Sequence, residues 1–114
     1  MTGPPSRGEV WDVDLGSSLG HERAGRRPAL VVSTDPFNQG PAELLVVVPL
    51  TGSFKGVPLH VEVAPPEGGL RKRSWITPED VRSISVERLG KRWGAVSAQT
   101  LAAVETRLRV LLEL

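Results

Sequence analysis

An imidazole, a carboxylate and three guanidiniums fall within the nine residues 20–28. His21 and Glu22 can exchange protons, and Arg27 offers a permanently charged planar cation that matches the oxygens of a phosphate. Pro28 disfavours a helical conformation for the residue before it, and the apolar run that follows is typical of a buried strand. The sequence therefore predicts that Arg27 lies where a loop enters a rigid strand and presents its charge to a ligand.

A hydroxyl follows the most aliphatic segment of the chain, residues 43–50. Thr51 at the end of that predicted strand can donate a hydrogen bond to a non-bridging phosphate oxygen. RNA carries its own nucleophile, the 2′-hydroxyl, so its cleavage needs only a base, cationic donors for the phosphate and an acid for the leaving 5′-oxygen. His21, Glu22, Arg27 and Thr51 are the residue types that this chemistry requires.

Each of these residues also has a purely structural interpretation. Arg27 could pair with Glu22 as a bridge across the loop, and Thr51 could simply end a strand, where threonine is common. His21 could be an exposed loop residue, although its pKa range suits a base. His60 is expected on the solvent face of a strand and without a role in catalysis.

Other classes of chemistry lack their motifs. The absence of cysteine excludes disulfides, thiolate nucleophiles and cysteine-ligated zinc. The two histidines and scattered acids show no zinc spacing, and no nucleophile elbow, dinucleotide fingerprint or P-loop occurs. We therefore expect a metal-independent reaction with no cofactor.

Length and charge describe one domain over residues 1–114, with residues 1–7 as a loose tail. No apolar run approaches the roughly 20 residues needed to cross a bilayer, so we expect no membrane association and a place in the bacterial cytoplasm.

The net charge is only +1, yet residues 66–92 hold seven Lys/Arg against four acids. This distribution leaves open a basic face for phosphate or an ordinary mixed surface.

Hydrophobic periodicity predicts a mainly β protein with a C-terminal helix. Trp11, Val13 and Leu15 share one face of a half-buried first strand. Ser97 can cap a helix over 97–114, whose apolar stripe would cover the barrel or a partner subunit. Further strands are expected over 29–33, 43–50, 59–63, 74–77, 81–84 and 93–96, with turns elsewhere. Five to seven short strands of this kind indicate a small barrel.

Four segments in order carry a family resemblance. They are Gly8-Glu9-Val10-Trp11, the stretch 20–28, Val-Val-Val-Pro-Leu-Thr at 46–51, and Val81-Arg82-Ser83-Ile84 followed by Glu87-Arg88-Leu89. Together they resemble the MazF/PemK/Kid toxins of the CcdB/PemK superfamily. The resemblance implies an SH3-like barrel that forms a symmetric homodimer. It also implies a sequence-specific, metal-independent endoribonuclease that leaves 2′,3′-cyclic phosphate and 5′-hydroxyl ends.

The same resemblance implies partners and substrate contacts. Single-stranded RNA would be the substrate, and a cognate MazE-like antitoxin would lay an acidic disordered segment across the dimer groove. Ser53, Phe54 and Lys55 resemble a flexible loop facing RNA, in which Phe54 stacks on a base or, alternatively, plugs the core. The substrate-binding set comprises Arg26, Ser53, Phe54, Lys55, Glu79, Asp80 and Arg82.

Two departures from the family pattern concern the segment before residue 81. Thr77 and Glu79 stand where Kid-type members have an arginine and an aspartate, so the acid survives and the arginine charge is lost. Asp80 replaces the usual glutamine of MazF-type members and only accepts hydrogen bonds, which should alter base preference. The cleavage sequence therefore cannot be transferred from a relative.

Two other functions remain open at this stage. A gyrase-poisoning toxin of the CcdB type would share the fold, but would not need the phosphate-binding pair of Arg27 and Thr51. A non-catalytic SH3-like binding module is disfavoured because the chain has no tyrosine, three tryptophans and two phenylalanines, whereas polyproline grooves are lined with aromatic residues.

Overall fold

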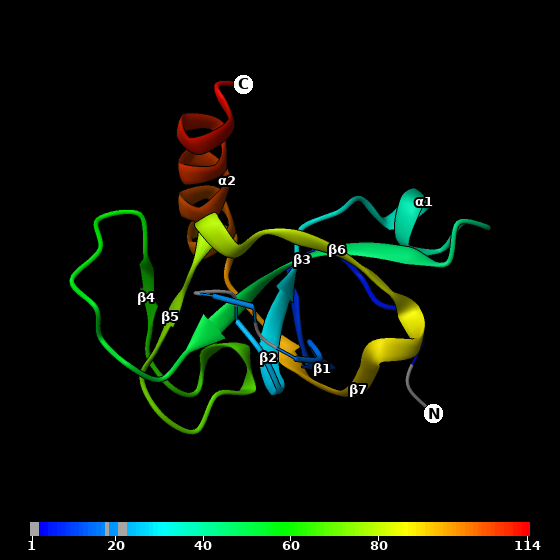
Figure 1. Ribbon diagram of the computed structural model, residues 1–114, viewed down its shortest axis with the longest axis horizontal. Helices are drawn as coiled ribbons and strands as arrows, with labels where there is room; N and C mark the ends of the chain where they lie inside the picture. Colours follow the sequence, from blue (N-terminus) through cyan, green and yellow to red (C-terminus); the bar gives the residue numbers. More distant parts are fainter. Residues whose placement is uncertain (1–2, 18, 21–22) are drawn as a thin grey trace.

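Strands dominate the computed structural model, which describes residues 3–17, 19–20 and 23–114 (Figure 1). The strands are β1 (Glu9–Asp14), β2 (Arg26–Val31), β3 (Leu44–Thr51), β4 (Val61–Val63), β5 (Ser74–Ile76), β6 (Arg82–Ser85) and β7 (Leu89–Ala95). The helices are α1 (Asp35–Asn38) and α2 (Ala98–Leu112), with single 3₁₀ turns η1 (Glu67–Gly69), η2 (Pro78–Asp80) and η3 (Val86–Arg88). The predicted mainly β fold with a C-terminal helix is confirmed.

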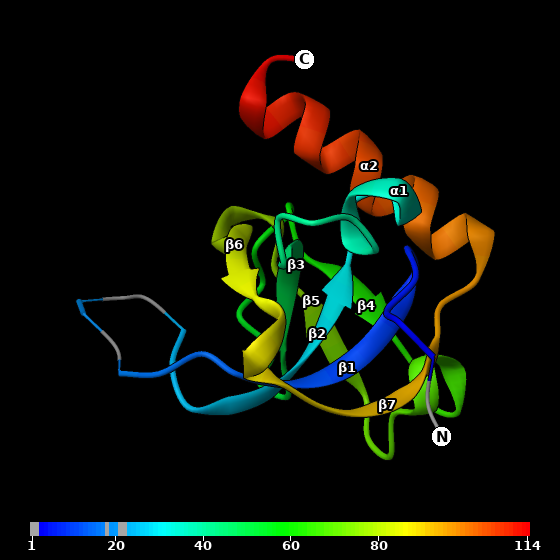
Figure 2. The same cartoon turned by 90° about the vertical axis from the view of Figure 1, so that its right-hand side faces the viewer.

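One antiparallel sheet contains these strands in the order β4-β5-β3-β2-β1-β7, and β6 adds to β3. The sheet curls on itself, as the prediction of a small barrel requires (Figure 2). β3 is central because β2 lies on one side and two strands share its other side. β6 pairs with residues 44–47 and β5 with residues 50–51.

Both faces of the first three strands contribute buried apolar side chains. The inner cluster packs within the curl of the sheet and includes Val10, Leu30, Val48 and Leu50, with Val104 from α2. The outer cluster lies on the opposite faces of the same strands and comprises Trp11, Val13, Leu15, Ala29, Val31, Leu45, Val47 and Ile84. The shared buried face of Trp11, Val13 and Leu15 is therefore confirmed, and Asp12 and Asp14 on the other face are partly exposed as predicted, although Val10 on that face is fully buried.

The start of α2 is held by two side chains. The Ser97 hydroxyl accepts a hydrogen bond from the Thr100 N–H at 3.1 Å, which is the predicted cap. The Glu67 carboxylate accepts the Ser97 N–H at 2.9 Å. Burial opposes ionisation of Glu67, but the hydrogen bonds from Thr100 and Ser97 outweigh it and keep the pKa of Glu67 below its ordinary value.

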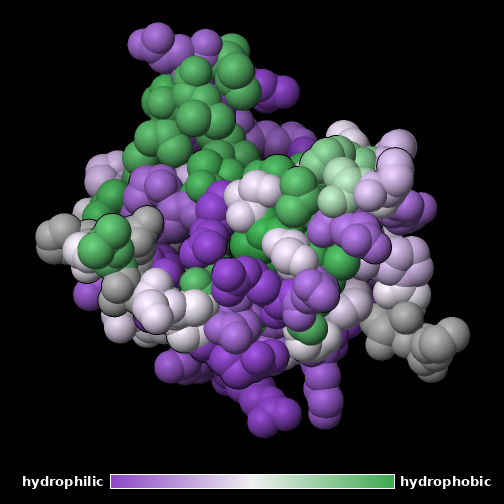
Figure 3. Space-filling model, turned by 45° about the vertical axis from the view of Figure 1, so that its right-hand side comes forward, coloured by the Kyte–Doolittle hydropathy of each residue, from purple (hydrophilic) through white to green (hydrophobic). Residues whose placement is uncertain are grey.

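The outer half of α2 extends past the sheet (Figures 1 and 2). Val104 is buried, and Leu101 and Leu108 pack against the inner cluster, but Leu111 and Leu112 are exposed. The predicted apolar stripe is therefore covered only along its first part within this chain, and Figure 3 shows apolar side chains gathered over the outer part of the helix. Among the described residues, no helix combines the length and the apolar character that a membrane span needs.

Arg7 joins three elements and corrects the prediction of a loose tail over 1–7. Its N–H donates to the Asp35 carboxylate of α1 at 2.7 Å, and its Nε donates to the Val32 carbonyl at 3.0 Å. Its guanidinium also pairs with Glu105 of α2. The chain is thus anchored from residue 7 onward.

Several element boundaries differ from the sequence prediction. β2 begins at Arg26 rather than residue 29, and β7 covers seven residues rather than an edge at 93–96. The predicted turn after residue 34 contains the short helix α1. Pro78–Asp80 form the 3₁₀ turn η2, and the strand predicted at 81–84 follows it as β6.

Substitution of Leu30 tests how much the inner cluster contributes to stability, because the Leu30 side chain has no solvent exposure. We expect Leu30→Ala to lower the free energy of unfolding by about 2–5 kcal/mol, since it removes buried methyl groups and leaves a cavity. Urea unfolding followed by far-UV circular dichroism measures the change. Leu114→Ala is the matched control, because that side chain is 83% exposed and its loss should change stability by less than about 0.5 kcal/mol.

Candidate functional site

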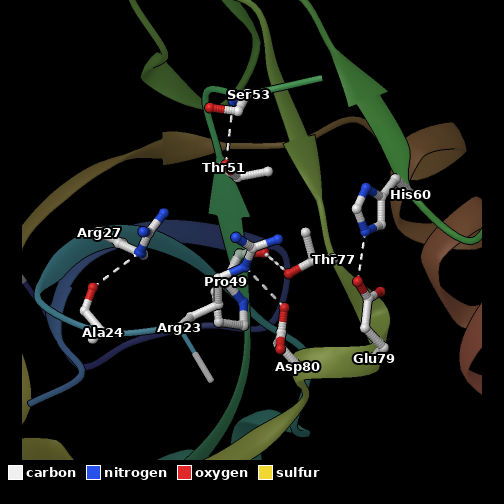
Figure 4. Close-up of polar contacts among 10 residues, drawn as sticks. All are labelled: Arg23, Ala24, Arg27, Pro49, Thr51, Ser53, His60, Thr77, Glu79 and Asp80. Atoms are coloured by element: carbon white, nitrogen blue, oxygen red, sulfur yellow. Dashed lines mark hydrogen bonds and ion pairs between the residues drawn. The ribbon is translucent and has the colours of Figure 1, made fainter. Parts of the chain in front are cut away.

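Arg27 and Thr51 come from the facing ends of β2 and β3 (Figure 4). The register between these strands matches Ala29 with Pro49 and Val31 with Val47. Continued by two residues, it places Arg27 opposite Thr51. Residues that face each other across an antiparallel pair point to the same side of the sheet, so the guanidinium and the hydroxyl share one face.

The Thr51 side chain is only 5% exposed, and its oxygen already accepts a hydrogen bond. The donor is the N–H of Ser53 at 3.2 Å (Figure 4). The hydroxyl proton is donated to no residue that the structure describes, so it is free to form a hydrogen bond to a ligand. The contact also fixes the start of the loop after β3.

A single hydrogen bond orients the Arg27 guanidinium. Its Nε donates to the Ala24 carbonyl at 3.0 Å, and its other N–H groups form no hydrogen bond to any residue that the structure describes. His21 and Glu22, the predicted proton-transfer groups, lie outside the described residues. The alternative of a Glu22–Arg27 bridge therefore stays a prediction.

A cavity of about 470 Å³ adjoins Arg27. Arg26, Arg71 and Lys72 contribute its cationic lining, and Trp93 is among the apolar side chains. Two members of the basic run 71–73 thus lie in the same concavity as Arg27. Other cations of residues 66–92 line different cavities, Arg82 and Arg88 beside η2 and Lys91 and Arg92 beside Gly69, so the choice between a basic face and a mixed surface stays open.

Arg26 and Arg27 both line the cavity of about 470 Å³, although neighbouring residues of a strand alternate between its faces. The Nε and Nη2 of Arg26 both reach one oxygen of Asp12, at 3.2 and 2.8 Å. The hydrogen bond and charge of Asp12 raise the pKa of Arg26. The structure thus does not bring Arg26 together with Thr51.

The turn η2 carries two acids, each paired with another side chain (Figure 4). Glu79 contacts Nε2 of His60 at 2.5 Å, and Asp80 accepts from Nε of Arg23 at 3.0 Å. The His60 side chain is only 3% exposed. The prediction that His60 lies on a solvent-facing side of a strand is therefore wrong.

Another cavity, of about 490 Å³, lies beside η2. Arg23, Asp80, Arg82 and Arg88 line it together with Glu79. Arg82 is positioned by donating from Nη1 to the Leu15 carbonyl at 3.3 Å. Three predicted substrate-binding residues, Glu79, Asp80 and Arg82, are thus brought together here.

Thr77 is fully buried and forms hydrogen bonds to the backbone. Its N–H and its hydroxyl both donate to the Pro49 carbonyl at 3.0 Å. The position that holds an arginine in Kid-type toxins is thus used here to join η2 to β3.

The loop after β3 exposes Ser53, Phe54 and Lys55. Phe54 is 71% exposed, so the alternative that it plugs the core is wrong. Its ring lies 5.6 Å from that of Trp75, tilted by 55°. Sequence reasoning did not bring Trp75 next to Thr51, because only the β3–β5 pairing shows that the two residues lie opposite each other.

Among the described residues, no three His, Asp or Glu side chains are grouped as metal ligands require. His60 and Glu79 form a pair only, and Asp80 is engaged by Arg23.

Comparisons with known proteins identify relatives along nearly the whole chain. The family model described as PemK-like, MazF-like toxin of type II toxin-antitoxin system matches residues 6–112. Endoribonuclease MazF9 of Mycobacterium tuberculosis is 38% identical over 113 residues, which cover 95% of this chain and 96% of that protein. Endoribonuclease EndoA of Bacillus subtilis is 28% identical over 95% of this chain and 94% of its own length.

Solved structures agree with these matches. The crystal structure of MazF from Deinococcus radiodurans superposes with a TM-score of 0.87 at 28% identity, covering 99% of this chain and 100% of that one. A MazE-MazF complex from the same organism contains a chain that superposes with a TM-score of 0.81 at 28% identity, covering 99% of both chains.

The Arg23–Asp80 pair is expected to couple the segment before β2 to η2. Both side chains are 19% exposed, so their charges are less screened than those of a surface pair. We expect a double-mutant cycle with Arg23→Ala and Asp80→Ala to give a coupling energy of about 1 kcal/mol in urea unfolding. A coupling below about 0.2 kcal/mol would show that the pair does not join the two segments.

Proposed function

Because the chain belongs to the family of PemK-like and MazF-like toxins of type II toxin-antitoxin systems, we propose that it is an endoribonuclease that cuts single-stranded RNA at a specific sequence without a metal ion. The observation that carries this proposal is the register that places Arg27 and Thr51 on one face at the facing ends of β2 and β3. A fixed cation and a hydroxyl donor at adjacent strand ends can hold the two non-bridging oxygens of one phosphate.

The proposed reaction uses the nucleophile of the substrate. The 2′-oxygen attacks phosphorus as a base removes its proton, the bond from phosphorus to the 5′-oxygen breaks, and an acid protonates that oxygen. The products are a 2′,3′-cyclic phosphate and a 5′-hydroxyl. Arg27 and Thr51 stabilise the charge that grows on the phosphate oxygens, and His21 or Glu22 handles the protons.

Cationic side chains support the choice of a polyanionic substrate. Arg71 and Lys72 share a cavity with Arg27, so a strand whose phosphate reaches Arg27 meets further positive charge there. Lys55 offers another cation on the loop that follows Thr51. Glu79, Asp80 and Arg82 supply acceptors and a donor for base edges at the neighbouring cavity.

We assign the antitoxin interaction to the same face. A solved relative is a MazE-MazF complex, and an acidic segment would complement the cations around Arg27. In this proposal two copies of the chain form a symmetric homodimer in the bacterial cytoplasm. A disordered, acidic segment of a MazE-like antitoxin folds across the groove between them and blocks access of RNA.

The reaction class is tested by incubating the protein with total RNA in EDTA and mapping the new 5′ ends. We expect cleavage at one short consensus sequence with 5′-hydroxyl products, because the proposed charge stabilisation comes from Arg27 and Thr51. Loss of cleavage in EDTA with recovery on addition of Mg²⁺ would contradict metal independence. Cleavage without any consensus would contradict sequence specificity.

Arg27 itself is tested by substitution. We expect Arg27→Ala to lower kcat by about 100- to 1000-fold, the usual effect of removing one donor that stabilises transition-state charge. The rate is measured with an oligonucleotide that contains the mapped consensus. Arg109→Ala, which removes an exposed guanidinium from α2, is the matched control and should cut at the native rate. Full activity of a correctly folded Arg27→Ala protein would refute the site assignment.

A further inference from the structure

We propose that the edge strand β7 carries a second RNA-contacting surface, which binds the part of the substrate that flanks the cut site on one side. Three cations of this surface bind flanking phosphates, and one exposed indole stacks on a flanking base. The cations are Arg71, Lys91 and Arg92, and the indole is that of Trp93. The inference rests on the proposed function, because it concerns the same RNA, but it adds a surface outside the site of Arg27 and Thr51.

A cavity of about 380 Å³ beside β7 is the first observation. Its lining consists of Gly69, Arg71, Lys91, Arg92 and Trp93, and none of the described residues in that lining is acidic. Arg71 and Lys91 form no ion pair with any residue that the structure describes. Arg92 donates to Glu9 from Nε at 2.6 Å, and its terminal nitrogens donate to no described residue. Each of the three cations can therefore bind a phosphate.

Close packing of glycines holds the backbone before Arg71 against β7, where Figure 2 shows the green turn of η1 beside the strand. A Cβ added at Gly69 would lie 2.0 Å from the Trp93 carbonyl oxygen, and one added at Gly94 would lie 2.7 Å from the Gly69 nitrogen. Leu70, the next residue, is buried in the inner cluster. Arg71 thus follows two anchored residues, which fix its position beside the indole.

The segment 70–73 also connects this surface to the proposed cleavage site. Arg71 and Trp93 line both the cavity beside β7 and the larger one of about 470 Å³. Lys72 extends over the residue that follows Thr51, since a Cβ added at Gly52 would lie 2.6 Å from its Nζ. An RNA strand whose phosphate is bound at Thr51 can therefore continue over Lys72 and Arg71 to β7.

The balance of charge distinguishes this surface from the cavity beside η2. That cavity contains two acids, Glu79 and Asp80, among its cations. The lining beside β7 instead combines three cations with Trp93, which is 40% exposed. Cations next to an exposed aromatic face are typical of surfaces that bind single-stranded nucleic acid. Because phosphate contacts and stacking tolerate any base, the surface adds affinity for the flank without reading its sequence.

The test uses an oligonucleotide with the mapped consensus and a 2′-deoxy group at the cut position, so that it binds without being cleaved. Versions extended by a short run of uridines on the 5′ side or on the 3′ side are compared with the unextended one. We expect one of the two extensions to lower the Kd of the native protein by about 10- to 100-fold, because it reaches β7. A run of adenosines on the same side should give a similar gain.

Two substitutions on β7 separate charge from stacking. Lys91→Ala should reduce the gain from the extension and should lower the slope of log Kd against log salt by about 0.7, the value for one phosphate contact on a single strand. Trp93→Ala should remove most of the gain, whereas Trp93→Phe should keep it because it keeps an aromatic face. An extension of abasic nucleotides should bring the native protein to the level of Trp93→Ala.

Arg109→Ala is the matched control, because it removes an exposed guanidinium from α2 and should keep the full gain from the extension. The comparison of extended with unextended RNA also corrects for any general effect of a substitution on folding. Such an effect would weaken the binding of both oligonucleotides by the same factor.

The outcomes separate this inference from the proposed function. If the unextended RNA is bound and the native oligonucleotide is cut, but neither extension improves binding or the β7 variants keep the full gain, the second surface is refuted and the nuclease proposal stands. If the β7 variants weaken only the binding of an acidic antitoxin peptide, the surface binds protein and the inference is also refuted. If no RNA is bound or cut, both proposals fail.

Discussion

The pairing of β3 with three other strands is the constraint on which the rest of the structure depends. β2 occupies one side of β3, and β6 and β5 divide the other side between residues 44–47 and 50–51. A strand buried on both faces cannot shift register by one residue without exposing its apolar side chains. The same rigidity fixes Thr51 relative to Arg27 on β2 and Trp75 on β5.

Polar contacts then fasten the irregular segments to this frame. Thr77 donates twice to the Pro49 carbonyl, and Pro78 begins η2 directly after it. η2 in turn holds the acids that pair with His60 and Arg23. Each of these residues has a partner in another segment, which specifies where that segment lies, although the buried Nδ1 of His60 forms no hydrogen bond to any described residue.

Sequence reasoning succeeded where the signal was local. Alternation of Trp11 and Val13, and Ser97 before a helical pattern, depend only on neighbours in the chain. It failed for His60, because alternation in a strand does not show that a later turn will cover one face with Glu79. It did not place Trp75 beside Thr51 for the same reason, since their facing positions follow from a pairing between distant segments.

The family resemblance predicted the fold and the nuclease chemistry. The positions at which this sequence departs from the family pattern can be explained only from the structure. Thr77 cannot replace the arginine of Kid-type toxins, because it is fully buried and its hydroxyl donates to the backbone. Positive charge near Arg27 comes instead from Arg71 and Lys72, on the segment between η1 and β5. Because Thr77 carries no charge and the cations Arg71 and Lys72 line the cavity beside Arg27, we expect a base preference different from that of Kid-type toxins.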